Sequence, residues 1–318
     1  MSRSAFLTGV CTLTLLTAWL PPPAWLLPTG SAADFAWIEG EQPTSINVAL
    51  TAAGGGNQQF LSAEKWLSLN FEGPQVDQDV PAEGVLIQYE LTLDQDSHSE
   101  IWMRLGYEFA RSPFDWRIDE GPWSRVEPDQ LTTDLMEIAF WCEVAWLQLG
   151  KQPLAAGRHT LAVRLPKTQN EQGETNRLLF ACDAICVSAS PFRPHSRFKP
   201  GESGRDEQDA AAEQHVFEFP EAAGPARVNL PLGGLWEVCR DDEQQPGETA
   251  APIRQLPVDP IWKAIEVPGD KNRLRPDLLF AHRLWFRTRF RVPDSLADRS
   301  WLLVFPANNL HTTLYVHG

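Results

Sequence analysis

The chain has 318 residues, of which 43% are hydrophobic and 22% are charged, a composition typical of a globular protein, and its length suggests two domains. The net charge is −15, and residues 34–190 hold 10 Lys and Arg against 24 Asp and Glu. No basic patch of the kind that binds a phosphate backbone is visible, so nucleic acid is not expected as a partner.

Residues 1–33 have the pattern of a secretory signal peptide. Arg3 precedes an apolar run that ends at Leu20, the prolines at 21–23 end any helix there, and Ser31-Ala32-Ala33 is a small-residue cleavage pattern. An uncleaved anchor is the alternative, but the prolines interrupt the ~20 apolar residues that a spanning helix needs. We therefore expect a secreted or periplasmic protein with no stable membrane insertion after cleavage.

Residues 34–190 are expected to form a first domain made of strands. Five strand-like runs are separated by clusters of Gly, Pro, Asp and Asn, and they cover residues 84–93, 100–109, 145–150, 157–165 and 177–188. Only residues 134–141 have a pattern that also suits a helix. Many short strands bounded by turns favour an all-β sandwich or jelly roll.

Four cysteines follow the predicted cleavage site, and in an exported chain they allow three disulfide pairings: Cys142, Cys182, Cys186 and Cys239. In the strand-like "ACDAICV", Cys182 and Cys186 are expected on one face, about 13 Å apart. That separation is too long for a disulfide, and no His lies at the spacing of a zinc site. We expect these two to be buried free thiols.

Residues 191–226 are rich in Pro, Gly, Ser and charged residues, which indicates an interdomain linker. Strand patterns resume over 227–318, for example in "LGGLWEV", "LWFRTRF" and the closing "TLYVHG". The last pattern stops at Gly318, where a Gly would normally begin a hairpin turn. We therefore expect a second β-sandwich domain, at 227–318, that is incomplete.

No catalytic motif is present in the sequence. It contains no nucleophile elbow, zinc-protease motif, P-loop or dinucleotide fingerprint, and no alternation of strands and helices typical of an α/β barrel. A glycosidase needs two carboxylates about 5–10 Å apart across one bond, and sequence spacing does not identify such a pair. We assign no catalytic residue.

The second β region resembles the N-terminal sugar-binding domain of glycoside hydrolase family 2. The resemblance is carried by "LGGLWEV" (232–238), "WKAIEVPG" (262–269), "LWFRTRFRVP" (284–293) and "WLLVFPANNLHTTLYVHG" (301–318). Phe286 stands where the family has Tyr, and His317 where it has Asn. The resemblance implies a jelly roll and a parent protein that hydrolyses O-glycosyl bonds, with its two catalytic glutamates on a barrel that this chain lacks.

The first domain resembles a galactose-binding-like carbohydrate-binding module. The resemblance is carried by "FAWIEGE" (35–41), "IWMRLGYEF" (101–109), "LAAGRHTLAVRL" (154–165) and "DAICVS" (183–188). It implies an oligo- or polysaccharide partner. By position it also implies a structural Ca²⁺ held by Glu39, Glu41 and Asp183, whose oxygens suit that ion. Plain solvated acids are the alternative for these three residues.

In such modules loop aromatics contact the sugar, and residues 107–127 are the best candidate stretch. Aromatic faces stack on sugar rings, while acids and arginines bond the hydroxyls. The predicted contact residues are Tyr107, Asp115, Trp116, Arg117, Asp119 and Trp123. The alternative is that Trp116 and Trp123 cap the core of the sandwich. Two further tryptophans, Trp141 and Trp146, are expected to belong to the core.

The function expected is carbohydrate binding within a secreted family-2-like glycosidase. A non-catalytic glycan-binding or cell-surface protein is the alternative, and a spacer without ligand is a third possibility.

Overall fold

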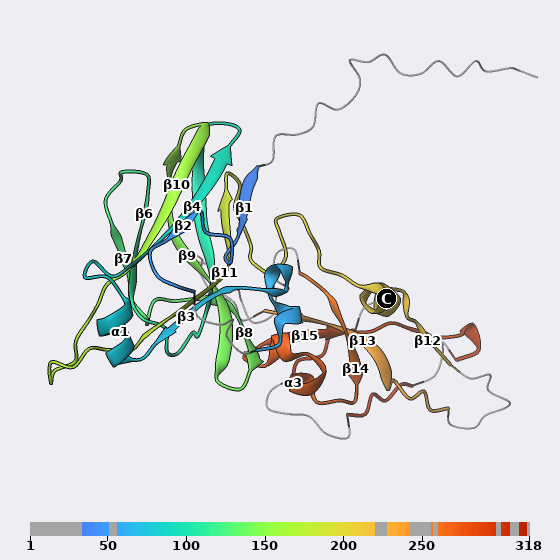
Figure 1. The fold of residues 1–318 in the computed structure, drawn as a ribbon. Coiled ribbons are helices and arrows are strands. Elements are labelled where there is room, and N and C mark those ends of the chain that lie inside the picture. Colours follow the sequence, from blue (N-terminus) through green and yellow to red (C-terminus); the bar gives the residue numbers. More distant parts are fainter. Residues whose placement is uncertain are drawn as a thin grey trace, which may run out of the picture.

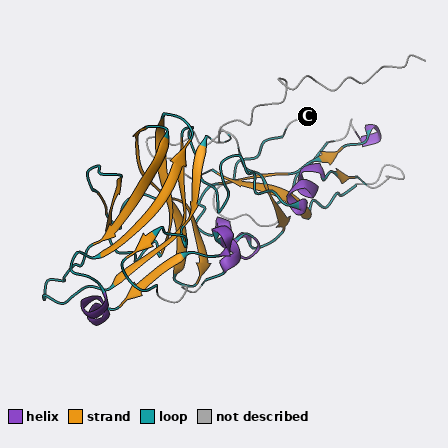
Figure 2. Ribbon diagram, turned by 45° about the horizontal axis from the view of Figure 1, so that its top comes forward, coloured by secondary structure: helices purple, strands orange, loops and turns teal. Residues whose placement is uncertain are grey.

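The computed structural model describes residues 34–50, 56–219, 228–241, 256, 260–296, 300–305 and 312–316, and the predicted signal peptide lies outside them. Strands dominate this part of the chain (Figures 1 and 2). The strands of the first domain are β1 (Phe35–Glu39), β2 (Ser45–Ile46), β3 (Leu67–Phe71), β4 (Val85–Leu93), β5 (Ser97–Gly106), β6 (Phe114–Ile118), β7 (Ser124–Val126), β8 (Thr133–Ala139), β9 (Cys142–Leu154), β10 (Gly157–Leu165) and β11 (Leu178–Ser188).

The later strands are β12 (Phe217–Glu218), β13 (Gly234–Arg240), β14 (Lys263–Val267), β15 (Leu284–Arg287) and β16 (Phe290–Arg291). The helices are short, and they are α1 (Gly73–Asp79), α2 (Glu207–Gln214) and α3 (Lys271–Leu274). Among the described residues, no helix has both the length and the hydrophobicity needed to cross a bilayer.

The first domain is a sandwich of two antiparallel sheets. Six strands form one sheet in the order β1–β11–β5–β9–β8, with β3 pairing the other end of β11. Five strands form the second sheet in the order β2–β4–β10–β6–β7. The all-β class predicted from the strand periodicity is confirmed, and the strands of this sandwich run from Phe35 to Ser188.

The two faces of the six-stranded sheet are both covered, which explains why every residue of β11 is buried. Its inner face packs on the five-stranded sheet, to which β4 contributes the alternating Val85, Ile87, Tyr89, Leu91 and Leu93. Two smaller apolar clusters cover the outer face. One contains Leu61, Trp66, Met136 and Val144, and the other contains Trp102, Trp146 and Phe192.

A β-bulge in β11 changes which way the cysteines point. The register with β5 shifts between Cys182 and Ala184, so Cys182 joins the core between the sheets while Cys186 joins the outer cluster. The prediction that both lie on one face was therefore wrong. The thiols of Cys142, Cys182, Cys186 and Cys239 are all buried, and burial raises the pKa of Cys142 to about 11 and that of Cys239 to about 12.

Residues 134–141, whose pattern also suited a helix, form most of β8 and its turn into β9. Met136 and Ile138 are buried and alternate with partly exposed residues, so the period of two governs this segment.

The segment after β11, expected to be a linker, contacts both regions of the chain. Phe192 packs against Trp102 and Trp146, and the Trp146 indole N–H donates to the carbonyl of Ser196 at 2.7 Å. Further along, α2 packs against β13 and β14. We refer to residues 191–219 as the strap.

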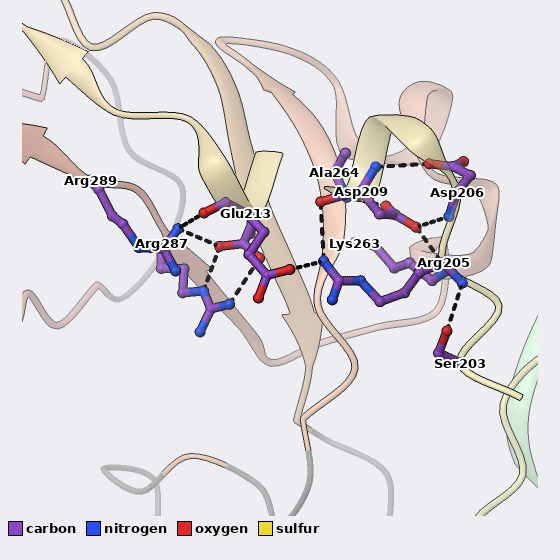
Figure 3. Close-up of polar contacts among 10 residues, drawn as sticks. Ser203, Arg205, Asp206, Asp209, Glu213, Lys263, Ala264, Arg287 and Arg289 are labelled. Carbon is purple, nitrogen blue, oxygen red and sulfur yellow. Dashed lines mark hydrogen bonds and ion pairs between the residues drawn. The ribbon is translucent and has the colours of Figure 1, made fainter. Parts of the chain in front are cut away.

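A buried carboxylate anchors the strap to the second region (Figure 3). Asp209 of α2 accepts hydrogen bonds from the Ala264 amide at 2.6 Å and the Lys263 ammonium at 3.0 Å. Burial opposes ionisation of Asp209, but these donors and the Asp206 amide outweigh it, so its pKa lies below the ordinary value. The second region itself is a three-stranded sheet, β14–β13–β15, around Val238, Ile265, Leu278 and Ala281.

The last two strand patterns predicted from the sequence are not strands in the structure. Residues 301–305 and 312–316 have no regular secondary structure, and their side chains are exposed. Trp301 contacts Phe219 and Tyr315 contacts Trp285, so both segments lie beside the second region.

Candidate functional site

Strand β6 places polar side chains on the outer face of the five-stranded sheet. Its sequence FDWRI alternates, so Phe114, Trp116 and Ile118 enter the core while Asp115 and Arg117 point outward. Residues 107–127 were expected to be irregular, but they contain β6 and its hairpin partner β7. The apolar positions 114, 116 and 118 are the signal that would have identified this strand.

Trp116 is a core residue and not a sugar contact. Its side chain is only 5% exposed, and its ring lies so close to Gly150 that a Cβ there would come within 3.0 Å of it. The structure therefore supports the alternative, in which Trp116 is part of the sandwich core, because neither face of its ring is open to a ligand.

Trp123, in the turn between β6 and β7, lies against two arginines on this face. The guanidinium carbons of Arg117 and Arg164 are each 4.5 Å from the centroid of its ring. At this separation the ring quadrupole attracts both cations, so the contacts fix the orientation of the indole. Trp123 is half-buried, which is the expected state of an aromatic platform with one side held by protein.

Asp115 holds the arginines in place. One of its oxygens accepts two hydrogen bonds from Arg164, at 3.1 and 2.8 Å, and the other accepts one from Arg125 at 3.3 Å. Because both oxygens of Asp115 already accept hydrogen bonds from arginines, this carboxylate positions the arginines and does not contact a ligand directly. Arg117 makes a longer, 3.7 Å contact with Glu120, so its donors are the least committed of the group.

We call Asp115, Arg117, Trp123, Arg125 and Arg164 the Trp123 cluster. The first three were predicted from the sequence, and Arg125 and Arg164 were missed. Arg164 could have been found from the strand pattern of "HTLAVRL", where it alternates with the buried Val163 and Leu165.

Asp119 is committed to another structural contact. Its carboxylate accepts from the Thr160 amide at 2.9 Å and pairs with Nδ1 of His159 at 2.8 Å, while Nε2 of His159 faces the Ala155 carbonyl at 2.8 Å. Burial alone would lower the pKa of His159, but the Ala155 carbonyl and Asp119 outweigh it and raise the pKa. The pair joins β10 to the turn that follows β6.

Tyr107 lies apart from the Trp123 cluster. It follows β5 in the six-stranded sheet, with a φ of 57°, and its ring packs on Trp66 with centroids 5.3 Å apart. Its hydroxyl lies 3.1 Å from the Ser68 hydroxyl. Tyr107 therefore belongs to the outer apolar cluster around Trp66, and the predicted set of six residues is not one site.

The three residues predicted to hold Ca²⁺ lie in one part of the six-stranded sheet but do not assemble as three ligands. Asp183 is fully buried, with one oxygen 2.7 Å from Arg104 and the other accepting from the Ser62 amide at 2.9 Å. Burial raises the pKa of Asp183 to about 6 against the opposing effect of Arg104. Within the described residues, no group of three acidic, His or Cys side chains could hold a metal ion.

Glu39 and Glu41 each keep a buried oxygen without a hydrogen-bond partner. The other oxygen of Glu39 accepts from the indole of Trp37 at 3.1 Å. Burial raises the pKa of Glu41, and the nearby charge of Glu39 adds to the effect. Two carboxylate oxygens in this state fit a cation, whereas Asp183 already has one in Arg104.

The tip of the β8–β9 hairpin carries an exposed aromatic pair that the sequence did not predict. Trp141 was assigned to the core, but it is 74% exposed, and the neighbouring Phe140 is 83% exposed. Trp146, assigned with it, is fully buried as predicted. Strand periodicity alone did not reveal the difference, because Trp141 lies in the two-residue connection where the alternation is interrupted.

The chain was compared with known proteins. No family model matches it, and no curated protein matches its sequence. Among solved structures, it is similar to the C-terminal CBM6 of LamC, a laminarinase of Zobellia galactanivorans, at 10% identity and a TM-score of 0.29, covering 48% of this chain and 98% of that one. The CBM35 of Abf62 from Cellvibrio japonicus gives 10% identity and a TM-score of 0.29, covering 51% and 98%.

A third similar structure is the GH26-CBM35 β-(1,4)-mannanase of Podospora anserina, at 12% identity and a TM-score of 0.30. The match covers 58% of this chain and 36% of the mannanase, so the chain spans about a third of that enzyme's length.

Proposed function

We propose that the first domain binds a carbohydrate chain at the Trp123 cluster. The observation that carries this proposal is the Trp123 ring, held by Arg117 and Arg164 on the outer face of the five-stranded sheet. An oriented indole can stack on the apolar face of a pyranose, and guanidinium groups beside it can donate to the hydroxyls. Asp115 keeps the arginines in position before any ligand arrives, which lowers the entropy lost on binding.

The surrounding sheet face suits a hydroxyl-rich ligand better than an apolar one. Most outward residues of β4 and β10 are polar and at least partly exposed, among them Gln88, Glu90, Thr92, Arg158 and Thr160, and the apolar exceptions are Leu86 and the buried Ala162. Charges within the cluster are balanced, because the three arginines face Asp115, Glu120 and Glu127. A neutral sugar meets no net repulsion at such a surface.

A glycan-binding screen of the whole chain tests the proposal. The similar structures come from proteins described as acting on β-1,4-mannan, laminarin and β-1,3-galactan, so these three polymers form the first panel. Retardation of the protein in a gel containing one of them is the expected result. If no neutral polysaccharide in a broad set retarded the protein, carbohydrate binding would be contradicted. The remaining hypothesis would then be a spacer domain without a ligand.

We also propose that the parent protein is a family-2-like glycosidase, exported to the periplasm or the medium. Support comes from the ordered motifs at 232–238, 262–269 and 284–293, which lie on β13, β14 and β15 of one sheet. The alternative is a non-catalytic glycan-binding or cell-surface protein. Release of reducing sugar by the full-length gene product, and not by this chain alone, separates the two.

A structural Ca²⁺ at Glu39 and Glu41 is proposed as a stabilising ion for the same domain. Such an ion would neutralise the two carboxylates and occupy their unpartnered oxygens, while Asp183 remains paired with Arg104. We expect millimolar Ca²⁺ to raise the melting temperature of the chelator-treated protein, and Glu39→Gln with Glu41→Gln to remove that effect. An identical melting temperature with Ca²⁺ and with chelator would argue against the ion.

A further inference from the structure

The exposed pair at the β8–β9 hairpin tip is not needed to build the sandwich. Ala139 pairs with Cys142 across the hairpin, so Phe140 and Trp141 form its two-residue connection. Their rings contact each other edge to face, with centroids 5.4 Å apart and planes at 72°. With 83% and 74% of their surfaces exposed, they bury little against the rest of the domain.

Two large aromatics at this position are unfavourable for folding. The turns that connect two strands through two residues require a positive φ, and Asn and Gly are favoured there because they adopt a positive φ most easily. Trp141 adopts a φ of 59°, which disfavours a bulky side chain. An exposed aromatic pair in which the Trp141 backbone is strained indicates a surface that contacts a ligand.

The charges near the tip restrict what that ligand can be. Glu137 lies directly opposite Glu143 on the two strands of the same hairpin, and Glu108 also raises the pKa of Glu143, although burial is the largest cause. The first domain as a whole holds 10 Lys and Arg against 24 Asp and Glu. Anionic polymers and anionic membranes are therefore repelled from this tip.

The angle between the rings also selects among carbohydrates. Two rings at 72° cannot lie flat together on the planar surface of a crystalline polysaccharide. They can contact successive sugar units of a single chain that twists about its axis, because each ring then meets a different unit.

We propose that Phe140 and Trp141 form a second carbohydrate contact, for a soluble polysaccharide chain without acidic groups. This inference rests on the proposed function, since it extends carbohydrate binding from the Trp123 cluster on the five-stranded sheet to the β8–β9 hairpin of the six-stranded sheet. A polymer that engages both contacts is held more tightly than a short oligosaccharide that fills one of them.

The test compares variants of the full chain against soluble galactomannan, laminarin and β-1,3-galactan, and against trisaccharides of the same sugars. The variants are the double variant Phe140→Ala with Trp141→Ala, the single variant Trp123→Ala, and Leu131→Ala as a matched control. Leu131 is a suitable control because it is 66% exposed and lies in the loop before β8. Polygalacturonate and microcrystalline cellulose complete the set of probes.

We expect the double variant to lose about tenfold in affinity for the polymer, with trisaccharide binding and the Leu131→Ala control unchanged. Equal polymer affinity of the double variant and the wild type would overturn the second contact while leaving the Trp123 cluster intact. If Trp123→Ala has no effect and only the double variant loses binding, the proposed site fails and the hairpin contact stands. Binding to cellulose or polygalacturonate through Phe140 and Trp141 would overturn the assigned ligand class, and no binding by the wild type would overturn both proposals.

Discussion

Arg104 and Asp183 form an ion pair with no exposed surface on either side chain, at a separation of 2.7 Å. Arg104 also donates to the Phe60 carbonyl at 2.9 Å, and Asp183 accepts from the Ser62 amide, so the pair ties the loop before β3 to the six-stranded sheet. Removing one charge leaves the other buried without a counterion, and this destabilises the folded state far more than removing both charges does.

We predict that Arg104→Met destabilises the domain by ~3–5 kcal/mol, because the Asp183 carboxylate loses its only ionic partner among the described residues. The double variant with Asp183→Asn is expected to be more stable than the sum of the two single changes implies. Urea denaturation followed by fluorescence measures all three variants. A loss below ~0.5 kcal/mol for Arg104→Met would show that the pair contributes little.

The Asp119–His159 pair predicts a pH-dependent contribution to stability. The pKa of folded His159 is raised, so its contribution is complete below the unfolded pKa, near 6.5, and disappears as the pH rises through the folded value. The difference in melting temperature between wild type and His159→Gln should therefore be largest near pH 6 and shrink toward pH 8.5. The exposed His98, changed to Gln, serves as the control. A difference that stays constant from pH 5 to pH 9 would refute a role for the imidazolium.

The roles of individual tryptophans were only partly predictable from the sequence. Trp116 is buried because it alternates with Phe114 and Ile118 on the inner face of β6, and Trp146 lies within the apolar run of β9 that begins at Val144. Trp123 and Trp141 lie in turns, where no periodicity applies. The exposure of Trp123 depends on its contact with Arg164, and that of Trp141 depends on its place in the β8–β9 connection. Both are features of the tertiary structure, which the local sequence pattern does not contain.

The sequence predicted a linker without a helix at this point, and helix α2 changes how the two β regions are joined. Asp206 caps the helix by accepting from the Asp209 amide at 2.8 Å, and Asp209 in turn bonds β14. A second ionic group lies in the same sheet, where buried Glu237 of β13 accepts from Arg287 at 2.6 and 2.9 Å. The strap is therefore held by both regions.

Substitution of Asp209 tests this attachment. We expect Asp209→Ala to release α2, because the Ala264 amide and Lys263 lose their acceptor, at a cost of ~1–3 kcal/mol. Limited proteolysis should then cut within 199–219 faster than in the wild type. Glu207→Gln, an exposed acid in the same helix, is the matched control. Equal cleavage rates for Asp209→Ala and the control would mean that the strap is held by other contacts.

Composition misled the prediction of the strap, whereas periodicity worked for most strands. Pro, Gly and charge between 191 and 219 are typical of a linker, yet the burial of Phe192 and Asp209 depends on distant partners in β5, β9 and β14. The bulge at Cys182 and Ala184 was equally invisible, because it is a register shift between two strands. The strands β4, β5, β10 and β11 were all found from their alternating or apolar runs.

Among the described residues, regular secondary structure is concentrated in the first domain. Its sandwich has two hydrogen-bonded sheets and a continuous core, and the all-β class of this domain was predictable from the strand patterns. The second region presents exposed apolar side chains on its described C-terminal segments, including Trp301, Leu302, Val304, Leu314 and Val316.

Hydrogen exchange should reflect this contrast. We expect the amides of β4, β5, β9, β10 and β11 to exchange slowest, and those of 301–305 and 312–316 to exchange within seconds, because the latter have no ladder hydrogen bonds. Mass spectrometry of peptic fragments measures both sets. Slow exchange in 301–305 would show that this segment is paired in solution.

We propose that Trp123, oriented by Arg117 and Arg164, binds carbohydrate. Isothermal titration of the best glycan from the screen into the wild type and into Trp123→Ala tests it most directly. Because the ring contributes the stacking surface and no described backbone depends on it, the variant should keep the wild-type melting temperature and lose affinity by about tenfold or more. A folded Trp123→Ala protein that binds the glycan as tightly as the wild type would contradict the account.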